Sequence, residues 1–263
     1  MNERLAKLRS KLTATGIEGF LVTNPENRYY LSGFTGSAGV LLVTFTGAVL
    51  MTDGRYTEQA RAECRDVEVV EAKRLWPDGV LQAVRESGIR SLGAEARHLS
   101  YEGWRELQEG LGGTLLVPVR DLVEEFRLVK EPGEITLIKE AVRLVDAVFG
   151  ESLKALRAGV RERDWALELE FALRRTGAER AAFDFIVASG WRSALPHGVA
   201  TDKEVRPGEL VVVDCGGVWQ HYCADFTRTV VVGEAAPWQK EIYRAVLAAQ
   251  EAAIAAIRQG VAA

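Results

Sequence analysis

Two aspartates, Asp214 and Asp225, are the residues of this chain whose type and spacing are best suited to chemistry. Each lies beside an apolar, β-branched run, and glycine and polar residues separate the two runs. This pattern predicts two antiparallel strands joined by a short turn. A turn centred near Trp219 and Gln220 would place the two carboxylates directly opposite each other. Like charges repel in that position, so we expect a divalent cation bound by their oxygen atoms. The alternative is that one aspartate ends a strand or caps the turn and the other faces water.

Four short runs around these aspartates carry a resemblance to a known family: Ala188-Ser189-Gly190, Ala194-Leu195-Pro196-His197-Gly198, Gly208-Glu209-Leu210 and Asp225-Phe226-Thr227-Arg228-Thr229. In their order and separation they resemble the M24 metallopeptidases, and in particular the branch of Xaa-Pro aminopeptidases and prolidases. Two earlier runs resemble the creatinase-type N-terminal domain of that branch: Tyr30-Leu31-Ser32-Gly33-Phe34-Thr35-Gly36-Ser37 and Thr52-Asp53-Gly54-Arg55-Tyr56. The resemblance spans nearly the whole chain.

The resemblance implies a pita-bread catalytic domain with a dinuclear metal site, formed by two aspartates, one histidine and two glutamates. In such a site Asp214 chelates one metal ion and Asp225 bridges the pair. The two divalent ions are expected to be manganese, with cobalt or zinc as the alternatives. The implied reaction is hydrolysis of the peptide bond between an N-terminal residue and proline, as performed by an Xaa-Pro aminopeptidase or a prolidase. The implied partner is a peptide with proline in the second position.

Only the two aspartates of that implied set of ligands can be placed in this chain. The resemblance puts the histidine and the glutamates further downstream, but no histidine follows His221. The acidic residues after Thr229 are Glu234, Glu241 and Glu251, and none lies in a strand-like run. We therefore expect a creatinase-like N-terminal domain followed by the first half of a pita-bread domain, as a truncated chain. The alternative function is a non-catalytic binding or assembly module, or an inactive fragment of the same fold.

Three further residues are candidates for supporting roles. His197 lies in a Pro-His-Gly run, and the resemblance implies an active-site histidine that contacts substrate without binding metal. Without that motif, a lone loop histidine is usually exposed to solvent. Thr227 and Thr229 have the same strand parity as Asp225, so we expect them to share its face and to orient the ligands by hydrogen bonds. They are equally well explained as ordinary β-branched strand residues.

Composition excludes several classes of protein. The chain has 263 residues, of which 48% are hydrophobic and 27% charged, which indicates a globular protein large enough for two cores. Its net charge of -4 is evenly mixed along the chain, so no nucleic-acid partner is expected. The longest apolar runs are too short to cross a membrane and the start lacks the features of a signal peptide, so we expect a cytoplasmic protein.

An odd number of cysteines argues against a disulfide framework. We also expect a homodimer, because half of a pita-bread domain leaves sheet edges and an apolar face uncovered.

Helix-like and strand-like segments alternate along the chain, which predicts an α/β fold in two domains, residues 1–126 and 127–263. The boundary is placed near Arg127 because Lys130-Glu131-Pro132-Gly133 breaks the pattern before a new helix. Helices are expected at residues 3–15, 56–65, 77–87, 101–110, from 134 to a stop near Gly159, 165–175 and 237–258. Strands are expected at residues 19–23, 40–43, 48–52, 67–70, 91–94, 115–117, 183–187, 210–214 and 222–232.

Overall fold

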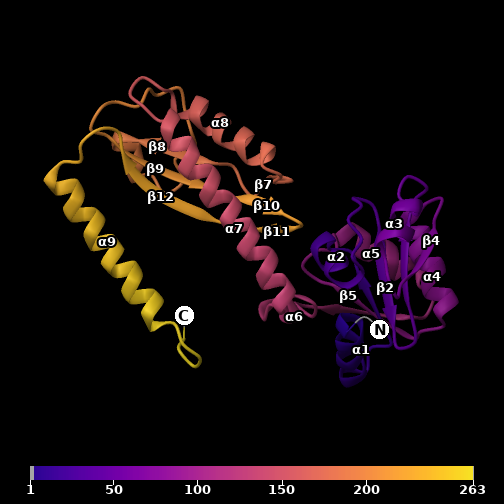
Figure 1. Cartoon of the computed structure of the whole chain (residues 1–263). Coiled ribbons are helices and arrows are strands. Elements are labelled where there is room, and N and C mark those ends of the chain that lie inside the picture. The colour runs from indigo at the N-terminus through magenta and orange to yellow at the C-terminus, as the bar shows by residue number, and fades with distance from the viewer. Residues whose placement is uncertain (1–2, 263) are drawn as a thin grey trace. The chain divides into compact units, whose positions relative to one another are not determined.

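The computed structural model describes residues 3–262 and divides the chain into two compact units between Lys130 and Glu131 (Figure 1). Each unit has its own hydrophobic core. The sequence-based division after residue 126 falls inside α6 (Glu124–Leu128), the last helix of the first unit, and stays a prediction. The alternation of helices and strands confirms the predicted α/β class.

The first unit is built on a six-stranded mixed sheet with the order β4-β3-β2-β1-β5-β6. Its strands are β1 (Gly19–Val22), β2 (Val40–Thr44), β3 (Ala48–Thr52), β4 (Glu68–Glu71), β5 (Ser91–Glu95) and β6 (Leu115–Val119). Its other helical elements are α1 (Glu3–Thr15), α2 (Pro25–Ser32), α3 (Thr57–Glu63), the turn η1 (Leu75–Gly79), α4 (Val80–Ser87) and α5 (Tyr101–Gly110).

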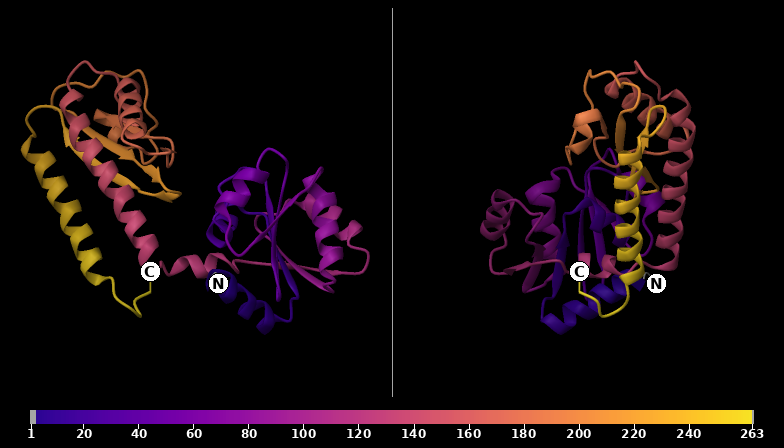
Figure 2. Two further views of the ribbon diagram at one scale, coloured as in Figure 1. Left: turned by 45° about the vertical axis from the view of Figure 1, so that its right-hand side comes forward. Right: turned by 90° about the vertical axis from the view of Figure 1, so that its left-hand side faces the viewer.

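Helices cover both faces of this sheet (Figure 2, left view). One core joins α1 and α2 to alternate residues of β1 and β2, while the other joins α4 and α5 to the residues between them. All four residues of β1 are buried, as expected for a strand enclosed by helices on both sides. Helix α1 matches its predicted bounds because Leu5, Leu8 and Leu12 recur at helical spacing and are all buried.

The second unit packs two helices on one face of a three-stranded antiparallel sheet with the order β12-β9-β8. A smaller sheet has the order β11-β10-β7. Its elements are α7 (Pro132–Ser152), the turn η2 (Leu153–Ala155), α8 (Glu162–Arg175), β7 (Arg180–Ala181), β8 (Ile186–Ser189), the turn η3 (Gly190–Ala194), β9 (Leu210–Cys215), β10 (Gly217–Trp219), β11 (Tyr222–Cys223), β12 (Phe226–Val231) and α9 (Pro237–Ala256).

Strand β9 gives the larger sheet two different faces. Val211, Val213 and Cys215 are buried and pack against the core that contains α7 and α8. The alternate residues of β9, which include Val212 and Asp214, are only half-buried. Because successive side chains of a strand point to opposite faces, Asp214 lies on the face turned away from α7 and α8.

Three expected elements of the second unit differ in the structure. The strand expected at residues 183–187 begins later, as β8, and the one expected at 222–232 is divided into β11 and β12. Helix α7 ends at Ser152, well before Gly159, which instead adopts a left-handed conformation (φ 86°) in the connection to α8. Glycine with positive φ is as common in turns as at helix ends, so its presence alone does not locate a helix terminus.

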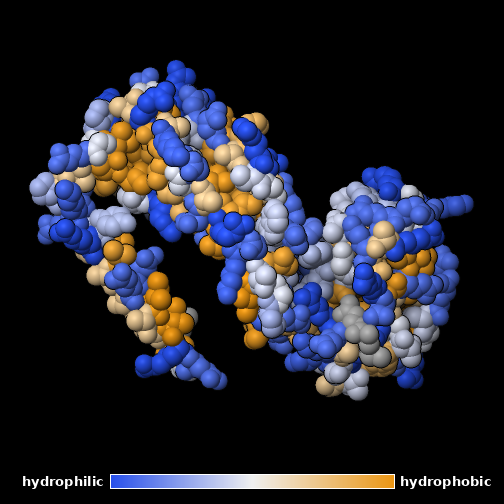
Figure 3. Space-filling model, in the orientation of Figure 1, coloured by the Kyte–Doolittle hydropathy of each residue, from blue (hydrophilic) through white to orange (hydrophobic). Residues whose placement is uncertain are grey.

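Helix α9 begins beside the turn before β9, where the side-chain amide of Gln239 donates to the carbonyl oxygen of Gly208 (2.8 Å). Figure 3 shows orange atoms along this helix. Its exposed large hydrophobic side chains are Trp238, Ile242, Tyr243, Val246, Leu247 and Ile254. No helix within residues 3–262 has both the length and the apolar character required to cross a lipid bilayer.

Candidate metal site

The hairpin that carries the two aspartates turns one residue later than the sequence suggested. Trp219 pairs with Tyr222, so Gln220 and His221 form a two-residue turn. Both have positive φ, 46° and 67°, which is the conformation of a type I′ hairpin turn. With this register Asp214 pairs with Thr227. The prediction that Asp214 and Asp225 are directly opposite each other is therefore wrong.

The two aspartates are instead diagonal neighbours on one face. Asp225 lies in the gap between β11 and β12, two residues before Thr227, which pairs with Asp214. Burial alternates through this segment: Ala224 and Phe226 are buried in the core, while Asp225 and Thr227 are exposed. Side chains in diagonal positions remain within reach of each other across a ladder. The carboxylates therefore share the face that does not pack against α7 and α8.

Gly216 allows the strands to approach each other between the two aspartates. A Cβ atom at this position would overlap the carbonyl oxygen of Ala224 and would press on the ring of Phe183. Ala224 also donates its N–H to the carbonyl oxygen of Gly217 (2.9 Å). The backbones are therefore in close contact at the point where β9 ends and Asp225 enters β12.

One of the two threonines contacts a candidate ligand directly. The hydroxyl of Thr227 donates to Oδ1 of Asp214 at 2.8 Å. Thr229 pairs with Val212, one position further from the aspartates on the same face, and within residues 3–262 its side chain makes no hydrogen bond to either of them. Only Thr227 is therefore placed to orient Asp214 by a hydrogen bond.

The thiol of Cys215 reports on the charges around it. Burial, with smaller contributions from the charges of Asp214 and Asp225, raises its pKa to about 12, although Arg228 acts to lower it. Both carboxylates are therefore close enough to repel a thiolate at this position. Cys215 points into the core on the other face of β9 and stays protonated at neutral pH, which excludes it as a thiolate ligand. Cys64 and Cys223 are also free thiols, as expected.

His197 lies on a separate segment, two residues before Val199, which is in one row of the sheet with Asp214. It belongs to the 190–200 loop, the segment between Ser189 and Thr201, and its side chain is exposed. Ile186 of β8 is bridged to Val199 on one side and pairs with Asp214 on the other. Because neighbouring strands are about 4.8 Å apart, Val199 and Asp214 are separated by about 10 Å along this row. Within residues 3–262 no three His, Cys, Asp or Glu side chains form a group able to hold a metal ion.

The donor set of the aspartate pair fits part of a divalent-metal site. Carboxylate oxygens are suitable ligands for manganese, cobalt and zinc. None of the ion pairs formed by the described part of the second unit involves Asp214 or Asp225, so neither charge is neutralised by a lysine or arginine. Two carboxylates leave several coordination positions of each ion to other donors.

Comparisons with known proteins agree with this geometry. The model of metallopeptidase family M24 matches residues 136–263, and the model of the creatinase/prolidase N-terminal domain matches residues 4–129. An uncharacterized peptidase of Bacillus subtilis strain 168, YqhT, is 40% identical over 257 residues, which are 98% of this chain and 73% of that protein. The chain belongs to metallopeptidase family M24.

Solved structures of similar proteins share this M24 fold. The Xaa-Pro dipeptidase from Bacillus anthracis has a TM-score of 0.90 and 43% identity, over 94% of this chain and 70% of that one. The X-Pro aminopeptidase from Thermotoga maritima has a TM-score of 0.84 and 41% identity, over 90% of this chain and 68% of that one. The second unit is thus an M24 pita-bread-like domain preceded by a creatinase-type N-terminal unit, as the resemblance implied.

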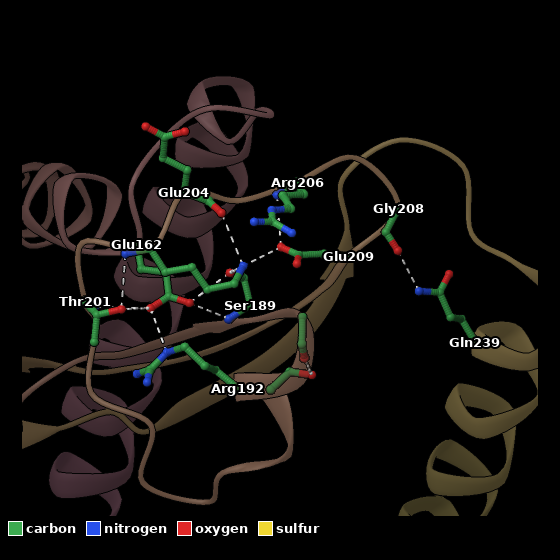
Figure 4. Close-up of polar contacts among 12 residues, drawn as sticks. Glu162, Ser189, Arg192, Thr201, Glu204, Arg206, Gly208, Glu209 and Gln239 are labelled. Atoms are coloured by element: carbon green, nitrogen blue, oxygen red, sulfur yellow. Dashed lines mark hydrogen bonds and ion pairs between the residues drawn. The ribbon is translucent and has the colours of Figure 1, made fainter.

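The M24 unit also contains a cluster of polar side chains around Glu162 (Figure 4). This cluster was not predicted from the sequence. Glu162, the first residue of α8, is 0% exposed. Its Oε1 accepts hydrogen bonds from the N–H and the hydroxyl of Ser189, both at 2.8 Å. Its Oε2 accepts from Nε of Arg192 (3.1 Å) and from the N–H and hydroxyl of Thr201 (3.2 and 2.8 Å). Burial alone would raise the pKa of Glu162, but these hydrogen bonds outweigh burial and lower it.

A second carboxylate extends this cluster of the M24 unit. Lys203 donates to the hydroxyl of Ser189 (2.7 Å) and to Oε2 of Glu209 (2.6 Å). Glu209 also accepts from the N–H of Arg206 (2.9 Å). Burial acts to raise the pKa of Glu209, but the hydrogen bond from Lys203 leads the effects that lower it. In the sequence, Glu162 resembles any exposed acid in the first turn of a helix, so no local signal distinguishes it.

Proposed function

We propose that this chain acts as a metal-dependent exopeptidase that hydrolyses the bond between an N-terminal residue and a following proline. The observation that carries the proposal is the placement of Asp214 and Asp225 on one face of the β9–β12 hairpin, without an ion-pair partner among residues 3–262. Membership of family M24 and the names of similar structures, a dipeptidase and an aminopeptidase for Xaa-Pro substrates, support the substrate class. The alternative of a non-catalytic module has no such support.

In this proposal each side chain has a separate task. Asp214 and Asp225 supply carboxylate oxygens to two divalent ions, and Thr227 holds Asp214 in one orientation through its 2.8 Å hydrogen bond. Thr229 pairs with Val212 and lies further along the ladder on the same face. His197, exposed on the 190–200 loop, contacts the substrate without binding metal. When bound, the divalent ions supply an activated water molecule and stabilise the developing negative charge.

Four finer points belong to the same proposal. We propose manganese as the preferred ion over cobalt and zinc, a homodimer as the assembled form, a cytoplasmic location, and a domain division at 126/127. Metal preference is measured by competition among the three ions. The assembled form is measured by light scattering after gel filtration. A homodimer would fit the apolar side chains that α9 exposes.

The experiment that tests the proposal measures metal binding and cleavage together. The purified protein is titrated with Mn²⁺ by calorimetry and then assayed on Ala-Pro, Ala-Pro-Phe and Ala-Ala. We expect Mn²⁺-dependent cleavage of the substrates with proline second, and the first two peptides separate a dipeptidase from an aminopeptidase. Asp214→Asn and Asp225→Asn are expected to lower metal affinity roughly a hundredfold or more, since loss of a mere supporting contact costs 10- to 100-fold.

Asp146→Asn is the matched control. It removes the same charge from an exposed position of α7 and should bind and cleave as the unaltered protein does. Equal Mn²⁺ affinity in Asp214→Asn, Asp225→Asn and Asp146→Asn would refute the assignment of the ligands. Equal cleavage of Ala-Pro and Ala-Ala would refute the substrate class.

A further inference from the structure

The carboxylate of Glu162 is the point where both ends of the 190–200 loop meet. Ser189, the last residue of β8, binds Oε1 through its N–H and hydroxyl, and Thr201, just after the loop, binds Oε2 in the same two ways. All of these bonds end on one side chain that is fully buried (Figure 4). A carboxylate that accepts several hydrogen bonds is held in one orientation, so it fixes the groups that donate to it.

Arg192 connects the Glu162 carboxylate to the backbone of the loop. Its Nε donates to Oε2 of Glu162 at 3.1 Å, and its Nη2 donates to the carbonyl oxygen of Val199 at 2.5 Å. The side chain of Arg192 is only 14% exposed. The N–H of Val199 in turn donates to the carbonyl oxygen of His197 (3.0 Å). A continuous chain of hydrogen bonds therefore connects Glu162 to the backbone of the candidate substrate-contacting histidine.

The start of α8 does not need this carboxylate to stay attached to the segment after the loop. The N–H of Glu162 donates to the carbonyl oxygen of Lys203, and the N–H of Arg163 donates to that of Thr201, both at 3.0 Å. The N–H of Val205 also donates to the carbonyl oxygen of Val160 (2.9 Å). These backbone contacts survive any change of side chain at position 162. The carboxylate adds contacts to Ser189 and Arg192, and Ser189 is also held by Lys203 of this segment through its hydroxyl (2.7 Å).

We propose that Glu162 is a positioning residue, which holds the 190–200 loop so that His197 stays close to the row of the sheet that Val199 shares with Asp214. The proposal deepens the proposed peptidase function and rests on it for the role of His197. Ile186 pairs with Asp214 and is bridged to Val199, so the loop and the aspartate share one row of the sheet. Ser189 stays paired with Val211 when the carboxylate is lost, so the change falls on Arg192 and on the part of the loop that Arg192 holds through Val199. Glu162 touches neither the metal ligands nor the substrate side of His197, and it acts through Arg192.

The test replaces Glu162 by glutamine in the full chain and measures amide hydrogen exchange. Glutamine keeps the size of the side chain but replaces one accepting oxygen by a donor, which opposes the donors already present. We expect exchange of the amides of residues 189–201 to become about tenfold faster or more, and to accelerate more than exchange in α7 and β9. Glu170→Gln is the matched control, because it removes a carboxylate of α8 that pairs with Arg174 on the surface. It should leave the loop unchanged.

A second variant keeps the test decisive if Glu162→Gln does not fold. Arg192→Lys preserves the charge but cannot donate to Glu162 and Val199 at once, because it lacks the planar fork of arginine. We expect faster exchange at residues 195–199, with the amide of Ser189 still protected. In a preparation that cleaves an Xaa-Pro peptide, Glu162→Gln is expected to lower kcat roughly 10- to 100-fold with unchanged Mn²⁺ affinity, since small misplacements near a reacting centre have effects of this size.

Each outcome bears on the proposal. A larger acceleration of exchange in the loop than in α7 and β9 supports it. Unchanged exchange in the loop would overturn it, and so would an even loss of protection across α7, β9 and the loop, which would make Glu162 a stabiliser of the whole unit. Failure of the unaltered protein to bind Mn²⁺ or cleave any Xaa-Pro peptide would refute the proposed function instead, and the exchange data would still decide what Glu162 holds.

Discussion

The second unit holds two sets of carboxylates that differ in almost every physical respect. Glu162 is fully buried and accepts five hydrogen bonds from Ser189, Arg192 and Thr201. Asp214 is half-buried with one hydrogen bond from Thr227, and Asp225 is exposed. The first carboxylate is fully satisfied by the protein. The second pair retains free oxygen atoms on an accessible face.

This difference shows how one type of side chain supports two functions. A buried carboxylate is tolerated only when hydrogen bonds and a counter-charge compensate its loss of water, so Glu162 is tied to the fold around it. Carboxylates on an accessible face keep contact with water and need no internal counter-charge, so Asp214 and Asp225 remain available to an added cation.

The largest effect is expected when the buried carboxylate is removed without replacement. Glu162→Leu leaves the donors of Ser189 and Thr201 and the charge of Arg192 without their acceptor, which should lower the free energy of unfolding by about 3 kcal/mol or more. Asp214→Asn, at the accessible pair, should change it by about 0.5 kcal/mol or less in the presence of EDTA. Urea denaturation of both variants measures the difference. An equal loss of unfolding free energy in Glu162→Leu and Asp214→Asn would mean that the buried and the accessible carboxylates do not differ in this way.

The next effect concerns metal-dependent stability. Because a ligand that binds only the folded state stabilises it, Mn²⁺ at 100 times its Kd should raise the free energy of unfolding by about 2.7 kcal/mol. The increase should disappear in Asp214→Asn and after removal of metal by EDTA. It should remain in Glu170→Gln, whose carboxylate is remote from the pair. Thermal unfolding with and without Mn²⁺ measures it, and an equal shift in Asp214→Asn would show that the ion binds elsewhere.

The pH dependence of stability should separate Glu162 from an ordinary acid. Its pKa in the folded protein is below the usual 4.5, so its contribution to stability is complete above pH 4.5 and is lost as the pH falls through the lower folded value. The difference in unfolding free energy between the unaltered chain and Glu162→Gln should be about 2 kcal/mol at pH 7 and should shrink below pH 4.5. Urea unfolding from pH 7 to pH 3 measures this difference, and a gap that widens in acid would contradict the assignment.

The smallest effect is expected at the hydrogen bond within the aspartate pair. Thr227→Val removes the hydroxyl that donates to Asp214 but keeps the shape of the side chain, so Mn²⁺ affinity should fall about tenfold. Thr229→Val makes the same change one pair further along β12 and should leave the affinity unchanged. Calorimetric titration of the two variants compares them directly. An equal loss in both would mean that the hydroxyl of Thr227 does not orient the ligand.

Much of the fold follows from short-range patterns in the sequence. Helices α1 and α5 have the predicted bounds because their buried residues recur at helical spacing. Helix α2 was not predicted, although Asn24, Pro25 and Gly33 are the residues expected around a helix. In the structure Asn24 caps the N-terminus and Gly33, with φ 80°, ends the helix. The helix between them is polar and short, so periodicity gave no signal and only the capping residues could have revealed it.

In the candidate site, too, features set by neighbouring residues could be predicted from the sequence, and features set by distant residues could not. The strands around Asp214 and Asp225 were predictable, but their register was not, because it depends on a turn in which Gln220 and His221 both adopt positive φ. Nothing in the local sequence marks Glu162, whose partners Ser189 and Thr201 are 27 and 39 residues away. Contacts of that separation arise only once α8 has packed against the sheet.

Gly216 has a consequence for how this family can change in evolution. Asp214 and Asp225 lie on an accessible face, so mutational drift can replace either one and erase the chemistry while the protein still folds. Gly216 has no such freedom, because any side chain would meet the backbone of Ala224 and separate the strands. We therefore expect lineages that abandon catalysis to lose the aspartates first and to retain the glycine. A relative that keeps the glycine at position 216 but lacks the aspartates at positions 214 and 225 would then be the non-catalytic descendant of an enzyme.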